Sequence, residues 1–297
     1  MLSVKCSNCA AEMSVDSQGE LYCPYCGSKV FMSDLDLEEY KKFRLNMLKL
    51  IASNTDAKAD AAEAGAWLVN ERVSFKAADG NVINVNYTFV SEEPGIKTYV
   101  TKDNVIYVFD AAHVKCANRM KEALASLDYP SAALKDLSKS FPKVKAEFQL
   151  EDGGLLMVSA KPGNVYPLYA FGNLKPKTVA WIVSRMENFC CVFEYNDIAH
   201  CGIDFNSVFI NPRTHEAFLY GGWWNYHFKR EGENTDLKDL RKVADEVLGR
   251  YQDEAPQMFI DFLKSSPEID AYTDFEYWDS VIEKGFGGHK FTRFDEN

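Results

Sequence analysis

The sequence lacks any continuous apolar run of the roughly 18 residues that a membrane-spanning helix needs. It also lacks a basic segment followed by an apolar stretch at its N-terminus, which is the pattern of a secretory signal. Positive charge is scarce, with 33 Lys and Arg against 44 Asp and Glu and a formal net charge of −11. This balance argues against a broad surface for nucleic acid or anionic membranes. We therefore expect a cytoplasmic protein without a membrane partner.

Internal repeats and low-complexity tracts are absent as well. The chain has 297 residues, of which 46% are hydrophobic. That is enough to build the core of one large domain or two ordinary ones.

Four of the eight cysteines lie in two pairs, CSNC and CPYC, separated by thirteen residues near the N-terminus. Each Cys-x-x-Cys pair directs two thiolates at one point, and two pairs complete the closed tetrahedral shell of structural zinc. Two disulfides or a redox pair fit less well, because no thioredoxin-like βαβ pattern surrounds either pair. Residues 1–32 therefore resemble a zinc ribbon, in which one structural Zn²⁺ is bound by Cys6, Cys9, Cys23 and Cys26.

The charge of this segment bears on its role. Residues 1–32 are slightly acidic, whereas a ribbon that grips a phosphate backbone needs several Lys or Arg. We expect protein contact or a structural cap rather than nucleic-acid contact.

The remaining cysteines are scattered among apolar neighbours. Free cysteine is often buried and behaves as a small hydrophobic side chain in a reducing compartment. We expect this for Cys116, Cys190, Cys191 and Cys201.

Residues 33–70 are rich in helix-forming residues and carry a broad apolar face. We expect a helical connector that packs on the next domain. An amphipathic helix that binds a partner is the alternative.

Strand patterns begin at Val73 and alternate with turn signals to about residue 160, with one amphipathic helix expected over 111–127. Helical patterns dominate from Lys175 onward, interrupted by one hairpin, SVFINPRTHEAFLY. The chain is therefore expected to belong to the α+β class, with a sheet-rich part followed by a helix-rich part.

The order of these segments is similar to that of a protein-kinase fold over residues 85–290. HCGIDFNSVFI takes the place of the catalytic-loop pattern, MVSAKPGNVYPLYAF that of the connection between lobes, and TDLKDLRKVADEVLG that of the buried helix beyond the loop. The resemblance implies a β-rich N-lobe at 71–162 and an α-rich C-lobe at 163–297, behind the zinc ribbon.

The residues that perform phosphoryl transfer in that family are missing. With His200 aligned, the catalytic Asp falls on Gly202, the metal-binding Asn on Ser207 and the metal-binding turn Asp on Tyr220. The strand that should hold the phosphate-binding lysine is NVIYVFD, which has none, and the glycine-rich loop would fall in VSEEPGIKTYV, which has one glycine and two adjacent acids. The resemblance leaves scaffold roles for His200, which would brace the loop against the helix near Asp236, and for Asp236, which would accept N–H groups of the loop.

Asp204 and Asn206 stand near the missing groups but in the wrong register. Asp204 lies two residues after the expected catalytic position, which moves a carboxylate about 6–7 Å along an extended chain. Phosphoryl transfer tolerates errors nearer 1 Å, so we expect neither residue to restore it.

The segment that replaces the activation segment is short and aromatic. Its aromatic residues either seal the core or form a surface for a partner, since Trp and Tyr dominate interface hot spots. The candidate partner surface consists of Trp223, Trp224, Tyr226 and Phe228.

These patterns favour a catalytically inactive, pseudokinase-like binding or scaffold protein that contacts other proteins and does not bind ATP. A divergent ATP-binding kinase or nucleotide-transfer enzyme is one alternative. A nucleic-acid-associated regulatory protein that uses the zinc ribbon is the other.

Overall fold

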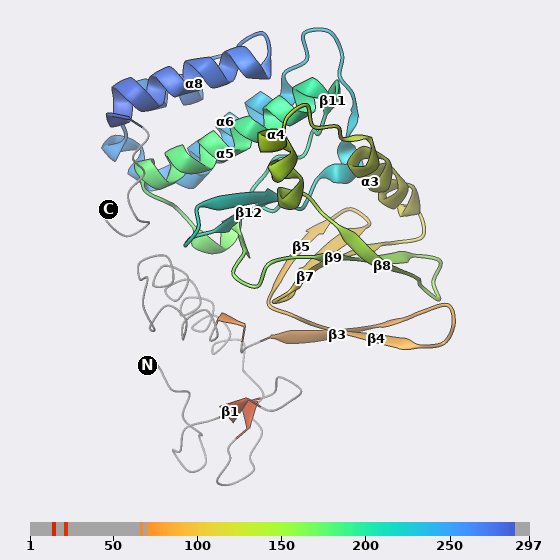
Figure 1. Cartoon of the computed structure of the whole chain (residues 1–297). Helices are drawn as coiled ribbons and strands as arrows, with labels where there is room; N and C mark the ends of the chain where they lie inside the picture. The colour runs from red at the N-terminus through yellow and green to blue at the C-terminus, as the bar shows by residue number, and fades with distance from the viewer. Residues whose placement is uncertain (1–13, 16–20, 23–65, 68–69, 289–297) are drawn as a thin grey trace.

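The structure is a computed structural model that describes residues 14–15, 21–22, 66–67 and 70–288. The expected zinc ligands and most of the helical connector lie outside these residues. Within the N-terminal part, β1 (Ser14–Val15) pairs with β2 (Leu21–Tyr22) in an antiparallel hairpin. The rest of the described chain forms a sheet-rich lobe and a helical lobe (Figure 1).

The sheet-rich lobe is built on five antiparallel strands in the order β5-β6-β7-β9-β8. One helix, α3 (Val114–Ser126), leaves the sheet after β7 and is the amphipathic helix that the sequence predicts at 111–127. Its buried face packs against the sheet and against the segment after Gly222. The strands are β5 (Phe89–Glu93), β6 (Ile96–Val100), β7 (Asn104–Phe109), β8 (Val144–Gln149) and β9 (Leu155–Ala160).

A separate hairpin, β3 (Glu71–Lys76) with β4 (Val82–Tyr87), lies on the side of this sheet away from the helical lobe (Figure 1). The sequence predicts the hairpin but treats residues 81–90 as one strand. In the structure this run ends at Tyr87 and resumes at Phe89, so it serves two sheets. A second, small core lies beneath the hairpin and contains Val85, Tyr99, Ile106, Leu150 and Leu156.

Two short helices that the sequence analysis did not predict, α4 (Ala132–Asp136) and η1 (Leu137–Ser140), connect α3 to β8. Ser131 caps α4 by accepting a hydrogen bond from the backbone N–H of Leu134 at 3.2 Å. η1 ends at Phe141, a buried residue that packs against Phe189 of α5. The connection therefore contributes to the joint core of the two lobes.

The helical lobe is centred on α5 (Pro176–Tyr195), which is buried on most sides. Proline at its first position fits there because it lacks only a donor that the helix start does not use. The other elements are β10 (Tyr166–Pro167), η2 (Leu168–Phe171), β11 (Ile198–Ala199), β12 (Val208–Asn211), β13 (Glu216–Leu219), η3 (Trp223–Asn225), β14 (His227–Phe228), α6 (Thr235–Leu248), η4 (Gly249–Glu254), α7 (Gln257–Lys264) and α8 (Ala271–Phe286).

Two small sheets fix the loops of this lobe. β12 and β13 form the hairpin expected from the sequence, and β10 adds to its edge. β11 pairs with β14, with Ile198 opposite Phe228 and Ala199 opposite His227. This second pairing holds the segment after Gly222 against the start of the loop that begins at His200.

The two lobes share one continuous core. Cys190 and Cys191 are buried in it, as expected, whereas Cys116 and Cys201 are only half-buried. None of the described helices is both long enough and apolar enough to cross a membrane.

Lys161 stabilises the connection between the lobes through its ammonium group. Its ammonium donates to the backbone oxygens of Lys102, Pro162 and Val165, each at 2.8 Å, and lies 4.5 Å from the centre of the Trp67 ring. Burial lowers the pKa of Lys161 to about 7, and the negative charge of Asp103 opposes this shift. Trp67 is itself held by a 2.9 Å hydrogen bond from its indole N–H to the oxygen of Gly163.

Candidate functional site

Asp236, near the start of α6, fixes the loop that begins at His200. Its two carboxylate oxygens accept the backbone N–H groups of His200 and Cys201 at 2.8 and 2.7 Å. The sequence analysis expected Asp236 to accept N–H groups of this loop, and the structure has these bonds. Burial raises the pKa of Asp236 to about 6, and the two donors oppose that rise.

The His200 ring lies in an apolar pocket between α5 and η3. It stacks on Phe193 at 5.4 Å between ring centres and meets the Trp223 ring edge-on at 4.7 Å. Its ring nitrogens are buried, and burial lowers its pKa to about 3, an effect that the backbone of Gly221 opposes. The ring is therefore neutral. His200 binds Asp236 of α6 through its backbone N–H, while its ring packs on Phe193 of α5 and Trp223 of η3.

Three glycines allow the loop to lie directly on the turn at 220–222. A Cβ atom at Gly202 would come within 2.6 Å of the Cα atom of Gly222. A Cβ atom at Gly221 would come within 2.8 Å of the Cα atom of Ser207, and Gly222 has a positive φ of 78°. Since real Cβ atoms do not approach backbone so closely, a carboxylate at position 202 would require the turn to move.

Ser207 and Asp204 hold each other within a tight turn. One Asp204 oxygen accepts the backbone N–H groups of Asn206 and Ser207 at 2.8 and 2.7 Å. The Ser207 hydroxyl in turn accepts the N–H of Asp204 at 2.7 Å and is buried. Both side chains therefore stabilise the loop, although Ser207 is buried whereas Asp204 is exposed.

Tyr107 and Tyr220 connect the two lobes where β7 contacts the turn at 220–222. The Tyr107 hydroxyl donates a 2.6 Å hydrogen bond to the backbone oxygen of Tyr220, and both side chains are buried. β7 is the strand NVIYVF, in which the sequence analysis looked for a phosphate-binding lysine. Burial raises the pKa of Tyr107 well above its ordinary value, so the phenol stays a neutral donor.

Trp224 fills the space next to this bond. Its ring is 3% exposed and meets the rings of Tyr107 and Phe109 edge-on, at 6.1 and 5.9 Å between centres. Its indole N–H donates to a carboxylate oxygen of Glu93 at 3.1 Å, and Glu93 ends β5. Burial raises the pKa of Glu93. Aromatic side chains and one carboxylate thus occupy the junction between the sheet and the helical lobe.

Comparisons with known proteins gave matches among solved structures alone. No protein-family model and no curated protein matches the chain. The ROP18 kinase domain in complex with AMP-PNP and sucrose matches with a TM-score of 0.45 and 10% identity, over 81% of this chain and 95% of that one. The BubR1 kinase domain matches with a TM-score of 0.45 and 10% identity, over 67% and 84%.

A third similar structure is the PAN3 pseudokinase of Drosophila melanogaster, with a TM-score of 0.41 and 12% identity. It is matched over 65% of this chain and 61% of its own. Because these likenesses are distant, the function proposed below is derived from contacts within this chain.

The aromatic segment 223–228 does not form one exposed surface. Trp223 is fully buried and Trp224 nearly so, which corrects their assignment to a partner surface. Tyr226 is half-buried, and its backbone oxygen accepts a 2.5 Å hydrogen bond from the guanidinium of Arg119. Phe228 remains available, since 74% of it is exposed. The two tryptophans point inward because η3 turns the chain beneath α3.

The sequence analysis missed Tyr107 and Glu93 as residues of this junction. The available signal was the tyrosine in the lysine strand, whose hydroxyl needs a partner once it is buried.

Proposed function

We propose that this chain is a catalytically inactive, pseudokinase-like protein that acts by binding another protein. The observation that carries the proposal is the closed junction between the lobes. The Tyr107 hydroxyl is bound to the Tyr220 backbone, and Trp224 covers that bond on the side of Glu93. On the resemblance stated from the sequence, the nucleotide phosphates would lie at this junction, where these aromatic side chains pack.

Each group that phosphoryl transfer requires is replaced by one with a structural task. Gly202 has no room for a carboxylate, and the Ser207 hydroxyl is bound within its own turn. The Tyr220 ring stacks on Phe218 at 5.8 Å, so it belongs to the core. Glu93 adds a carboxylate near the expected phosphate position, where it would repel an anion.

An exposed apolar surface offers a better partner site than the buried tryptophans. Glu194 at the end of α5 forms an ion pair with Lys229 and accepts the N–H of Ala271 at 3.1 Å. The residues next to these three in sequence are exposed and apolar or aromatic. This Glu194 surface consists of Tyr195 (46% exposed), Phe228 (74%) and Tyr272 (46%).

Such a surface suits a protein partner. Aromatic side chains gain most from burial at an interface, and the central ion pair adds charge complementarity. It is formed by the ends of three elements, α5, β14 and α8, so its shape depends on the packing of the helical lobe.

Nucleotide binding is the first test. The melting temperature of the full chain should be unchanged by about 1 mM Mg-ATP. A nucleotide that did bind, present at 100 times its Kd, would stabilise the fold by about 2.7 kcal/mol. That would raise the Tm by several degrees in a chain of this size. We also expect no phosphate transfer to a protein substrate with Mg²⁺ or Mn²⁺.

A clear rise in Tm, or any phosphate transfer, would overturn the proposal in favour of a divergent nucleotide-dependent enzyme, and transfer that survives Asp204→Ala would also exclude Asp204 as its base. RNA or DNA binding that weakens steeply with salt would favour the nucleic-acid alternative.

Partner binding is the second test. Phe228→Ser combined with Tyr272→Ser should abolish co-purification of the partner from the native host while circular dichroism stays unchanged. Val82→Ser is the matched control, because Val82 is also exposed, at 57%, but lies in β4 of the other lobe. If both variants retain the same partners, the Glu194 surface is not the site.

A further inference from the structure

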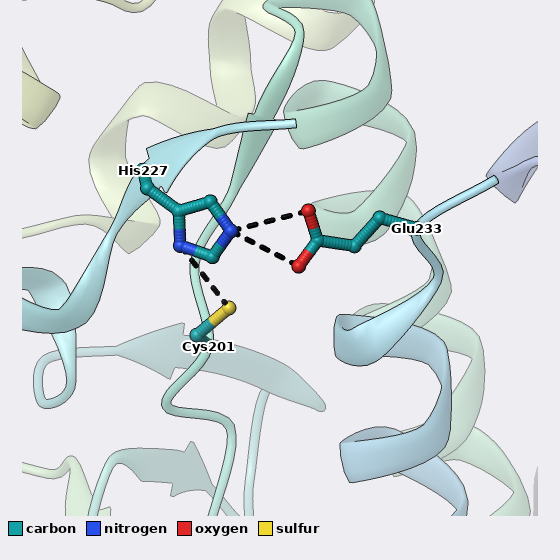
Figure 2. Close-up of side chains that lie close together, drawn as sticks. All are labelled: Cys201, His227 and Glu233. Carbon is teal, nitrogen blue, oxygen red and sulfur yellow. Dashed lines mark hydrogen bonds and ion pairs between the residues drawn. The ribbon is translucent and has the colours of Figure 1, made fainter. Parts of the chain in front are cut away.

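A thiol, an imidazole and a carboxylate lie close together near the loop that begins at His200 (Figure 2). They belong to Cys201, His227 and Glu233, and one ligand atom from each lies within 4.8 Å of the others. The pairing of Ala199 with His227 between β11 and β14 places Cys201 next to the histidine. Glu233 follows in the turn before α6.

The two ring nitrogens of His227 face different neighbours. Nδ1 lies 3.8 Å from the Cys201 sulfur, and Nε2 lies 3.0 and 3.1 Å from the two oxygens of Glu233 (Figure 2). A thiolate and an imidazole bound to one tetrahedral zinc ion stand about 3.5 Å apart, given bond lengths of about 2.3 and 2.0 Å. The observed sulfur–nitrogen distance therefore needs only a small adjustment to hold a metal ion between the two atoms.

Glu233 is held in place by bonds that do not involve the histidine. One of its oxygens accepts the backbone N–H of Arg230 at 3.0 Å, and the other accepts the Thr235 hydroxyl at 3.3 Å. A fixed carboxylate on Nε2 orients the ring and presents Nδ1 as the free electron pair, which is how second-shell carboxylates support histidine ligands.

Cys201 is also held. Its backbone N–H is bound to Asp236, and its φ of 56° lies in the left-handed region that side chains other than glycine rarely adopt. Such a conformation persists only where the surroundings impose it. The thiol is half-buried, and 33% of the His227 side chain is exposed, so the pair is accessible from solvent.

The charge around the thiol favours a metal site over a reactive nucleophile. Two carboxylates lie close by, because Asp236 accepts the backbone N–H of Cys201 and Glu233 contacts the His227 ring. Negative charge at this position attracts a cation. Thiolate with imidazole selects a transition metal of the zinc class over Mg²⁺ or Ca²⁺.

We propose that Cys201 and His227 bind a divalent metal ion of the zinc class, with Glu233 orienting the imidazole. Two protein ligands leave open coordination positions for water or for a side chain of a partner. Because the ligands lie 26 residues apart, the ion would cross-link the loop at 200–207 to the segment after Gly222. This site is separate from the zinc ribbon expected at the N-terminus.

Metal titration of the chelator-treated full chain tests the proposal. Zn²⁺ uptake, measured by equilibrium dialysis and elemental analysis, should fall by one equivalent per chain in Cys201→Ser and in His227→Gln. Cys116→Ser is the matched control, since Cys116 is also a half-buried free cysteine but lies on α3. Titration with Co²⁺ should show a thiolate-to-metal charge-transfer absorption that is weaker in Cys201→Ser than in Cys116→Ser.

Glu233→Gln keeps both ligands and should weaken Zn²⁺ binding about 10- to 100-fold without changing the number of ions bound. Equal metal uptake by the wild type and His227→Gln would overturn the proposal, even if Cys201→Ser fails to fold. Unchanged affinity in Glu233→Gln would overturn the assignment of the carboxylate as the group that orients the histidine.

Discussion

Replacing Asp274 with alanine would leave the guanidinium of Arg241 buried without its counter-charge. The two side chains form a two-pronged pair at 2.8 and 2.9 Å between α6 and α8, and they are only 0% and 4% exposed. The guanidinium also donates to the backbone oxygen of Phe262, in α7, at 3.1 Å. One ion pair thus connects three helices of the lobe.

The expected loss follows from this burial. Removing one partner of a buried ion pair costs about 3–5 kcal/mol, because the remaining charge is left in a medium that solvates it poorly. Asp274 also accepts the N–H of Glu268 at 2.8 Å, so a second buried donor loses its acceptor. We expect Asp274→Ala to lower the free energy of unfolding by at least about 3 kcal/mol.

Urea unfolding at neutral pH, followed by circular dichroism, measures this loss. Glu151→Ala is the control, because it breaks an ion pair with Lys76 whose side chains are 66% and 71% exposed and which should contribute about 0–1 kcal/mol. The double variant Arg241→Met with Asp274→Leu should cost less than Asp274→Ala, since it leaves no unpaired charge. A loss of less than about 1 kcal/mol in Asp274→Ala, equal to that in Glu151→Ala, would refute the reasoning.

Three further outcomes are expected. Tyr107→Phe should lower the free energy of unfolding by about 1–3 kcal/mol in urea, because it leaves the Tyr220 oxygen buried without its donor; no change would mean that water replaces the hydroxyl. Burial raises the pKa of Glu187 well above its ordinary value, so the folded chain keeps a proton that the unfolded chain loses, and stability falls as pH rises above about 4.3. Glu187→Gln should therefore stabilise the chain more at pH 8 than at pH 4.5 in thermal unfolding, and a difference independent of pH would contradict this. Protein purified without added metal should contain zinc, and Cys23→Ser should lose one equivalent while the rest stays folded; elemental analysis that finds no zinc in the wild type would exclude the ribbon.

The sequence predicted those parts of the fold that depend on local pattern. The strand patterns and turn signals from Val73 to about residue 160 predicted the sheet-rich part, and the helical patterns from Lys175 onward predicted the helical part. Asp236 was predicted to bind the loop because it begins a helix that resembles the buried helix beyond the catalytic loop of protein kinases. These signals lie within one element or between neighbours along the chain.

Contacts between distant segments could not be predicted in this way. The Tyr107–Tyr220 bond joins residues 113 positions apart, and no spacing rule applies to such a pair. The two tryptophans at 223–224 look the same in sequence whether they are buried or exposed, and only the packing of α3 against η3 decides between these states. Cys201, His227 and Glu233 likewise form no motif, because the pairing of β11 with β14 brings them together.

The contacts of Lys161 between the two lobes affect how tightly a partner can bind. Three carbonyl oxygens and the Trp67 ring fix the connection between the lobes at one end, and the Tyr107–Tyr220 bond fixes their junction at another. Rotation of one lobe against the other would have to break both sets of contacts. The relative orientation of the two lobes is therefore fixed before a partner binds. A partner that spans both lobes does not have to order them, so its binding free energy does not include that entropic cost.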